Sequence, residues 1–183
     1  VRFINAATDG DRTVLVTEQA NGSLREMIVR QGAFAPDRVQ RLLSTVAEAL
    51  CYLHERVPSI VHRDVKPENV LIVAGVAKLG DVGIAKHTTH TLTSHSGLMS
   101  SLYAAPEMWG SQGAARVGPK SDVYALGLMA LELLAGRHPF EDAESSHVVM
   151  RLHCDGVSVP QDVPEALRPA IERAVWKDPA FRW

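Results

Sequence analysis

No segment of this chain limits its possible folds more than residues 62–69, which read HRDVKPEN. A carboxylate (Asp64), an ammonium group (Lys66) and an amide (Asn69) share this stretch, and a second carboxylate, Asp81, follows a short β-favouring run. Together they can orient a hydroxyl, neutralise a phosphate and hold Mg²⁺, which favours one or two carboxylates plus substrate phosphates. Catalysis of phosphoryl transfer is mostly positioning and charge stabilisation. The sequence therefore predicts a phosphoryl-transfer site.

The apolar patterns around this segment predict an α+β domain with strands early in the chain and helices late. The predicted strands are residues 3–5, 13–16, 60–61, 70–73 and 77–79. The predicted helices are residues 24–30, 36–55, 121–135, 145–153 and 165–176. Asp9-Gly10 predicts a hairpin turn whose two central positions both need positive φ. Gly136 is placed to end the helix over residues 121–135.

With these motifs the chain resembles the protein kinase superfamily. Residues 62–69 match its catalytic-loop pattern H-R-D-L-x-x-x-N, with Val65 in place of leucine. Other resemblances follow in the family's order: residues 14–18 to the strand before the hinge, 105–107 to A-P-E, 121–127 to the start of the central helix, 138–140 to the loop after it, and 176–182 to a late arginine motif. The resemblance covers the whole chain. It implies a protein kinase-like fold, mainly the helical C-terminal lobe with the last strands of the N-terminal lobe.

The resemblance implies catalytic roles at the matching positions. Asp64 would accept or orient the substrate hydroxyl proton, and Lys66 would contact the γ-phosphate of ATP. Asn69 and Asp81 would hold Mg²⁺. Lys66 also indicates a serine/threonine kinase, because such kinases resemble D-x-K-x-x-N here while most tyrosine kinases carry an arginine-containing loop. ATP and Mg²⁺ are the implied cofactors, and serine or threonine residues of proteins the implied substrates.

The resemblance also implies an adenine site. Thr17 takes the gatekeeper position, and the backbones of Glu18 and Ala20 would meet adenine. Leu71 matches the position that packs under the base. On this reading residues 1–17 end the small lobe, 18–22 form the hinge, and 23–183 form the large lobe.

Contacts beneath the site follow from the same resemblance. His62 is expected to pack and hydrogen-bond under the catalytic loop, and Asp122 to tie the central helix back to it. Arg182 is expected to pair with Glu107. Arg63 is either a solvated charge or the group that receives a phosphate from the activation loop.

Besides Val65, the chain departs from the family pattern in three places. Val82 replaces the phenylalanine of D-F-G, which predicts looser packing on His62. Met99-Ser100 stands where G-T is frequent, so the substrate-docking loop is expected to differ in shape. A glycine-rich loop and a strand lysine do not occur in these 183 residues. The chain is therefore expected to be a partial kinase domain that binds nucleotide poorly alone and exposes an apolar cleft floor around Leu71.

A second function class stays open at this point. A pseudokinase, or a truncated product, would use the kinase large lobe as a protein-docking surface without catalysis. Val82 and the absence of small-lobe motifs motivate this alternative.

Residues 86–101 are polar and lack periodicity, which predicts a long loop. His87, His90 and His95 match no zinc-ligand spacing, and no cysteine joins them. The loop's hydroxyl residues are candidate phosphorylation sites or plain solvated polarity: Thr88, Thr89, Thr91, Thr93, Ser94 and Ser96.

The net charge, the cysteines and the apolar segments limit the kinds of partner and the location that the sequence predicts. A net charge of −2 gives no electrostatic reason to expect a nucleic-acid or membrane partner. Cys51 and Cys154 form no disulfide framework, which suits a reducing compartment, and both are expected to pack as small hydrophobes. No signal peptide or membrane span is recognised, so a cytoplasmic location is predicted. Residues 78–86 loosely resemble the never-in-mitosis-like kinases, but the subfamily stays unresolved, and the oligomeric state leaves no trace in the sequence.

Overall fold

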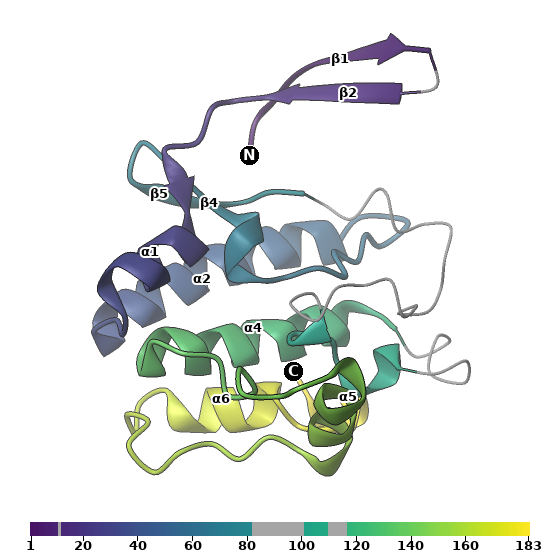
Figure 1. Cartoon of the computed structure of the whole chain (residues 1–183). Coiled ribbons are helices and arrows are strands. Elements are labelled where there is room, and N and C mark those ends of the chain that lie inside the picture. The colour runs from purple at the N-terminus through teal and green to yellow at the C-terminus, as the bar shows by residue number, and fades with distance from the viewer. Residues whose placement is uncertain (11, 82–100, 110–116) are drawn as a thin grey trace.

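The computed structural model describes residues 1–10, 12–81, 101–109 and 117–183. A two-stranded hairpin stands apart from a body made mainly of helices (Figure 1). The hairpin pairs β1 (Phe3–Asp9) with β2 (Arg12–Thr17), antiparallel. A second antiparallel sheet has the order β3-β4-β5, from Gly22–Ser23, Val70–Val73 and Val76–Leu79. This arrangement confirms the predicted α+β class.

The helices follow the predicted order. They are α1 (Leu24–Gln31), α2 (Pro36–His54), α4 (Pro119–Ala135), α5 (Ser146–Asp155) and α6 (Arg168–Ala174). The described residues also form three short 3₁₀ helices, η1 (Pro67–Asn69), η3 (Pro106–Met108) and η5 (Pro179–Phe181). Local chemistry sets several ends: the Ser23 side chain accepts the Glu26 N–H to begin α1. Gly136, at φ 76°, ends α4 as predicted.

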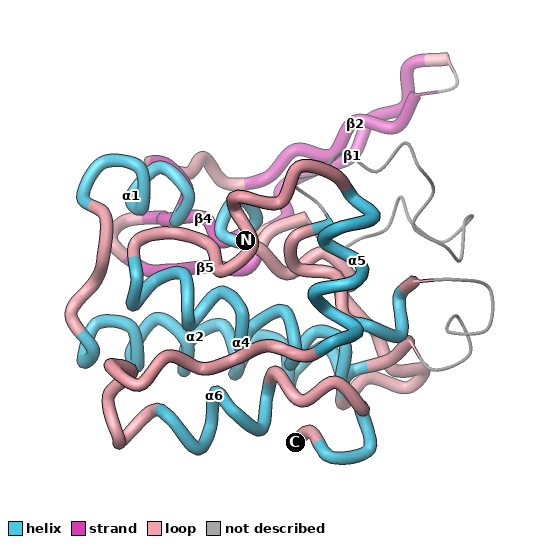
Figure 2. Tube along the Cα trace, turned by 60° about the horizontal axis from the view of Figure 1, so that its bottom comes forward, coloured by secondary structure: helices cyan, strands magenta, loops and turns pink. Residues whose placement is uncertain are grey.

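Helix α4 forms the centre of the helical body. It lies between α2 and α6 in both views (Figures 1 and 2). Tyr124, Leu128 and Leu133 on this helix are fully buried. A Cβ added at Gly127 would lie 2.7 Å from a Val175 side-chain carbon, so the absence of a side chain lets α4 approach the end of α6 closely. The predicted apolar face of α2 supplies Val39, Val46 and Leu50 to the same core.

The hairpin turn and one strand differ from the predictions. Asp9 pairs with Arg12, and Gly10 has φ 56°, so the turn begins one residue later than predicted. Residues 60–61 form no strand, because the Ile60 N–H donates to Leu53 O and the His62 N–H, two residues on, donates to the Asp122 side chain of α4. The two-residue strand β3 was not predicted.

The predictions for the last helix and for the two cysteines also differ from the structure. Helix α6 is shorter than the predicted 165–176, since Pro169 lacks an N–H and suits the first helical turn, where α6 begins. Cys51 and Cys154 are both exposed, so the prediction that they pack as small hydrophobes is wrong. Within the described ranges, no helix combines the length and apolar character needed to cross a bilayer.

Candidate active site

Three side chains of the predicted site lie in contact on the loop that carries η1. Lys66 Nζ lies 3.1 Å from Asp64 Oδ2. Asn69 Nδ2 donates to the Asp64 backbone oxygen at 2.7 Å and to Asp64 Oδ2 at 3.1 Å. The 3₁₀ turn sets this spacing, because Pro67 begins it and the Asn69 N–H donates back to Lys66 O. The loop therefore holds one carboxylate oxygen between an ammonium group and an amide.

The chain that follows β5 is tied to this loop. The Gly80 N–H donates to Asn69 O at 2.8 Å, and the Gly80 carbonyl accepts from His62 Nε2 at 2.9 Å. Asp81 comes next, with an exposed side chain and φ 48°, a left-handed conformation that residues other than glycine seldom adopt. Such conformations persist where surrounding contacts fix them, and they cluster at functional sites. The two bonds to Gly80 therefore hold Asp81 beside the loop of Asp64 and Asn69.

Asp122 anchors the catalytic loop from below, as predicted. Its Oδ2 accepts the His62 N–H at 2.8 Å, and its Oδ1 accepts the Arg63 N–H at 2.8 Å. His54 Nε2 also lies 2.8 Å from Oδ2. Arg63 has φ 64°, and the two bonds from consecutive amides to one buried carboxylate hold the loop in this turn. His62 is fully buried beneath the loop, which confirms its predicted packing role.

The predicted adenine contacts fall on two sheets. Leu71, on β4, is half-buried, and a Cβ added at Gly80 would meet its Cδ1 at 3.1 Å, so Leu71 packs next to the Asp81 turn. Thr17 ends β2 and is exposed, opposite Phe3 in the hairpin. Glu18 accepts from Lys78 Nζ at 2.7 Å, and this bond lowers the pKa of the Glu18 carboxyl. Ala20 lies between the sheets and is half-buried.

The A-P-E segment is clamped to the end of the chain. Arg182 donates to Glu107 Oε1 at 2.7 Å and to Oε2 at 2.9 Å, a two-pronged pair that is almost entirely buried. Ser121 Oγ adds a third donor to Glu107 at 2.7 Å. The predicted pairing of Arg182 with Glu107 is therefore confirmed.

One polar cluster beside the catalytic loop escaped the sequence analysis. It joins Arg25 on α1, Glu68 on η1, Glu132 on α4 and Tyr103, which precedes η3. Glu132 carried a signal, because it interrupts the apolar run from Val123 to Leu134 and a buried carboxylate needs a partner. No sequence signal identified its partner as Arg25, which lies 107 residues away in the sequence.

Several predictions fall outside the described residues. They concern Val82 and its packing on His62, the histidines at 87, 90 and 95, the Met99-Ser100 departure, and the candidate phosphorylation sites at 88, 89, 91, 93, 94 and 96. The part of the long loop that is described, Ser101, is buried.

Asn69 and Asp81 offer the kind of ligand that Mg²⁺ prefers. The Asn69 amide nitrogen donates to Asp64, which leaves Oδ1 as the acceptor of that side chain, and Asp81 supplies a carboxylate. In the described part of the chain, no group of three or more His, Cys, Asp or Glu side chains is placed to hold a metal ion. These ligands therefore fit an ion that takes its other ligands from phosphates and water.

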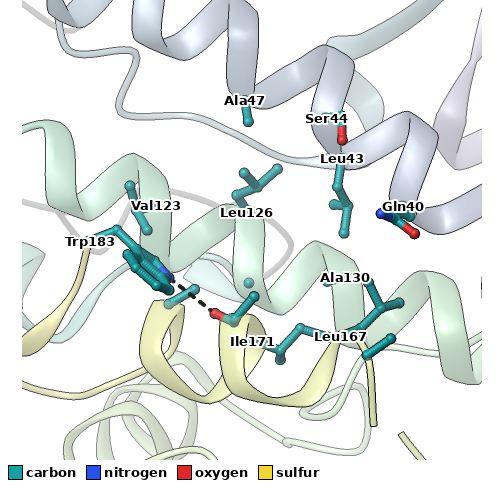
Figure 3. A pocket seen from close by; sticks show the side chains of 14 residues that line it. Gln40, Leu43, Ser44, Ala47, Val123, Leu126, Ala130, Leu167, Ile171 and Trp183 are labelled. Atoms are coloured by element: carbon teal, nitrogen blue, oxygen red, sulfur yellow. Dashed lines mark hydrogen bonds between the residues drawn. The ribbon is translucent and has the colours of Figure 1, made fainter. Parts of the chain in front are cut away.

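An apolar groove lies away from these residues, among α2, α4 and α6 (Figure 3). Its volume is about 340 Å³, and Leu43, Leu126, Ile171 and Trp183 are among the side chains that line it. None of the predicted site residues borders it. The groove therefore takes no part in the site around Asp64.

The architecture and the loop geometry together are consistent with a protein kinase-like fold. The protein kinase domain family matches residues 1–182, and the chain belongs to this family. Protein kinases as a family use ATP and a divalent metal ion.

Named relatives include bacterial and plant proteins. The chain is 35% identical, over 92% of its length, to serine/threonine-protein kinase drp72 of Corynebacterium efficiens. It is 32% identical to serine/threonine-protein kinase 12 of Arabidopsis thaliana and 31% identical to serine/threonine-protein kinase PrkC of Bacillus subtilis, over its whole length in both cases. The chain covers 32%, 41% and 29% of these relatives, respectively, so it spans less than half of each.

Proposed function

We propose that the protein transfers the γ-phosphoryl group of Mg-ATP to serine or threonine hydroxyls of protein substrates. The observation that carries this proposal is the contact of Asp64 with Lys66 and Asn69 on a loop bonded to the chain that leads into Asp81. The names of the relatives support the same activity.

In this proposal Asp64 takes the proton of the substrate hydroxyl as its oxygen attacks the γ-phosphorus of ATP. The new oxygen–phosphorus bond forms while the bond to the β-phosphate oxygen breaks and ADP leaves. Lys66, beside Asp64, places a positive charge where the transferred phosphoryl group needs it. Its contact with Asp64 also orients that carboxylate.

Asn69 and Asp81 are the proposed holders of Mg²⁺. When bound, the ion neutralises charge on the ATP phosphates and orients them. The bond from Gly80 to Asn69 O supports this assignment, because it fixes the spacing between the loop and the strand end that carry the two ligands.

For adenine we propose Leu71 beneath the base, the Glu18 and Ala20 backbones along its edge, and Thr17 at the gatekeeper position. Residues 1–17 would end the small lobe, 18–22 would form the hinge, and 23–183 would belong to the large lobe. The change of sheet between Thr17 and Gly22 supports these boundaries. The proposed partners are ATP and protein substrates, without nucleic acid or membrane, and the proposed location is the cytoplasm.

The test is phosphotransfer from Mg-ATP to serine and threonine peptides by the full-length protein. We expect Asp64→Asn to lower kcat by about 10²–10⁴-fold, the usual contribution of a positioned general base. Asp162→Asn, at an exposed position outside the site, is the matched control and should keep the wild-type rate. An Asp64→Asn protein with wild-type kcat would refute the proposal, and an inactive wild type that still binds protein partners would favour the docking-module alternative.

A further inference from the structure

Arg25 connects three elements through a single guanidinium group. Its Nε donates to Glu68 Oε1 at 2.7 Å, its Nη1 to Glu132 Oε1 at 2.5 Å, and its Nη2 to the Tyr103 hydroxyl at 2.7 Å. Tyr103 in turn donates its hydroxyl proton to Glu132. Nη2 also lies 3.5 Å from Glu132 Oε2, so the guanidinium contacts three residues and the four side chains form one closed network.

The burial of this network makes the arginine hard to replace. The Glu132 side chain is 2% exposed and Tyr103 is 4% exposed, whereas Arg25 and Glu68 lie partly open to solvent. Burial alone would lower the pKa of Arg25, but the bonds to Glu132 and Glu68 and the charge of Glu132 outweigh it, so its pKa is raised. A lysine would bring one ammonium group, which cannot reproduce the three directed bonds of the planar fork.

The network joins two segments that the proposed activity would place beside a peptide substrate. They are the loop that carries Asp64 and residues 101–105, which follow the expected substrate-docking loop. Glu68 directly precedes Asn69, in the loop that holds Asp64. Tyr103 belongs to residues 101–105, which lead into the clamped A-P-E segment. Glu132 fixes Tyr103 to the central helix α4 directly, and it fixes Glu68 through Arg25.

We propose that Arg25 is a positioning residue for the peptide substrate, because it sets the distance between the catalytic loop at Glu68 and the segment 101–105 at Tyr103. This inference rests on the proposed kinase activity. Arg25 itself touches no proposed ATP contact, so its removal should affect the use of peptide far more than the use of ATP.

The test compares three variants of the full-length protein. Arg25→Met removes the charge and keeps most of the side-chain stem, and Arg25→Lys keeps the charge without the fork. Arg30→Met is the matched control, because Arg30 lies on the same helix, is exposed, and pairs with Glu26 at 3.4 Å. The substrate is a serine peptide that the wild type phosphorylates, with Mg-ATP.

We expect both Arg25 variants to lower kcat/KM for the peptide by at least about tenfold, since a displacement of roughly 1 Å can reduce a rate by about 10²-fold. The KM for ATP should stay within about threefold of wild type, a split that marks loss of peptide positioning. Hydrogen exchange gives an activity-independent measure: amides of residues 66–69 and 102–105 should exchange about tenfold faster, while those of α6 keep the wild-type rate.

Two outcomes would overturn the inference. One is an Arg25→Lys protein with wild-type kcat/KM for the peptide. The other is faster exchange throughout the chain, α6 included, which would make Arg25 a contributor to global stability only. If the wild type transfers no phosphate at all, the proposed function fails instead, and the exchange pattern still decides whether Arg25 couples the two segments.

Discussion

The two ends of helix α4 each hold an arginine, and the two arginines are bound in different ways. At the first end Arg182 is 1% exposed and donates to both Glu107 oxygens and to three backbone carbonyls, those of Lys120, Trp176 and Lys177. At the second end the Arg25 side chain is 21% exposed, and its three partners, Glu68, Glu132 and Tyr103, all bond through their side chains.

This difference separates stability from positioning. Backbone carbonyls and a buried carboxylate fix the position of the Arg182 side chain, so the first cluster stabilises the fold. The second cluster is built from side chains of separate elements and borders the catalytic loop. We therefore expect the Arg182 cluster to dominate the free energy of unfolding and the Arg25 cluster to dominate the geometry of the site.

The largest expected effect is that of Arg182→Met. It should lower the free energy of unfolding by about 3–5 kcal/mol, because Glu107 is left buried without its ionic partner. Arg25→Met should cost less, about 1–3 kcal/mol, because the Arg25 side chain is 21% exposed and water can reach the space that it leaves. Glu132 also keeps its bond from Tyr103, and Glu68 can be hydrated. Urea denaturation measures the loss of unfolding free energy in both variants. A larger loss for Arg25→Met would contradict the expected difference between the two clusters.

A double variant serves as the control for this prediction. Arg182→Met combined with Glu107→Leu leaves no unpaired charge in the core, so it should be more stable than Arg182→Met alone. Equal stability of the single and double variants would show that packing of the arginine stem, rather than the buried charge, explains the loss.

The first cluster was predictable from the sequence and the second was not. Glu107, Asp122 and Arg182 stand in ordered motifs, so the resemblance assigned their contacts before any geometry was known. Arg25 stands in no such motif, and its partners lie between 43 and 107 residues away. Only Glu132, a charge inside an apolar helix, hinted that a buried partner was needed.

Local patterns located the elements better than their ends and pairings. The helical face of α2 and the stop at Gly136 follow from periodicity and backbone preference. Residues 60–61 favour a strand by residue type, yet the amides after them bond to Asp122, a contact that depends on the tertiary fold. The hairpin turn shifted by one residue because strand pairing, rather than the Asp-Gly dipeptide, set its register.

A middle-sized effect is expected from acid, through two buried histidines that pack between the clusters. Burial lowers the pKa of His153 from 6.5 to about 4, and burial together with the neighbouring His153 and Arg25 lowers that of His138 to about 3. Both are therefore neutral when folded, and the unfolded chain takes up their protons first as the pH falls. Stability is then greatest above pH 6.5 and decreases as the pH falls towards these lowered values.

Each of the two histidines should remove about 1.4 kcal/mol of stability per pH unit below 6.5. Unfolding free energies measured by urea denaturation at pH 7, 6 and 5 give this slope. His153→Leu loses the bonds of His153 to Tyr124 and Ser101 and should be less stable at pH 7, but its slope between pH 6 and 5 should be shallower than that of the wild type. An unchanged slope would mean that His153 titrates normally in the folded protein.

The smallest effect is expected just beyond α4, at a surface ion pair. Arg137 lies 3.4 Å from Glu141, and both side chains are well exposed. Arg137→Ala should change the free energy of unfolding by less than about 0.5 kcal/mol, because exposed pairs are screened and lose side-chain entropy. If Arg137→Ala lowered the free energy of unfolding as much as Arg182→Met, burial would not explain the difference between the two clusters.

The most direct test of the central claim is the chemical identity of the product. Full-length protein would be incubated with radiolabelled Mg-ATP and peptides that contain serine, threonine or tyrosine, followed by phosphoamino-acid analysis. The account predicts label on serine or threonine, and loss of that label in Asp64→Asn. Label on tyrosine alone, or hydrolysis of ATP without any transfer to peptide, would contradict it.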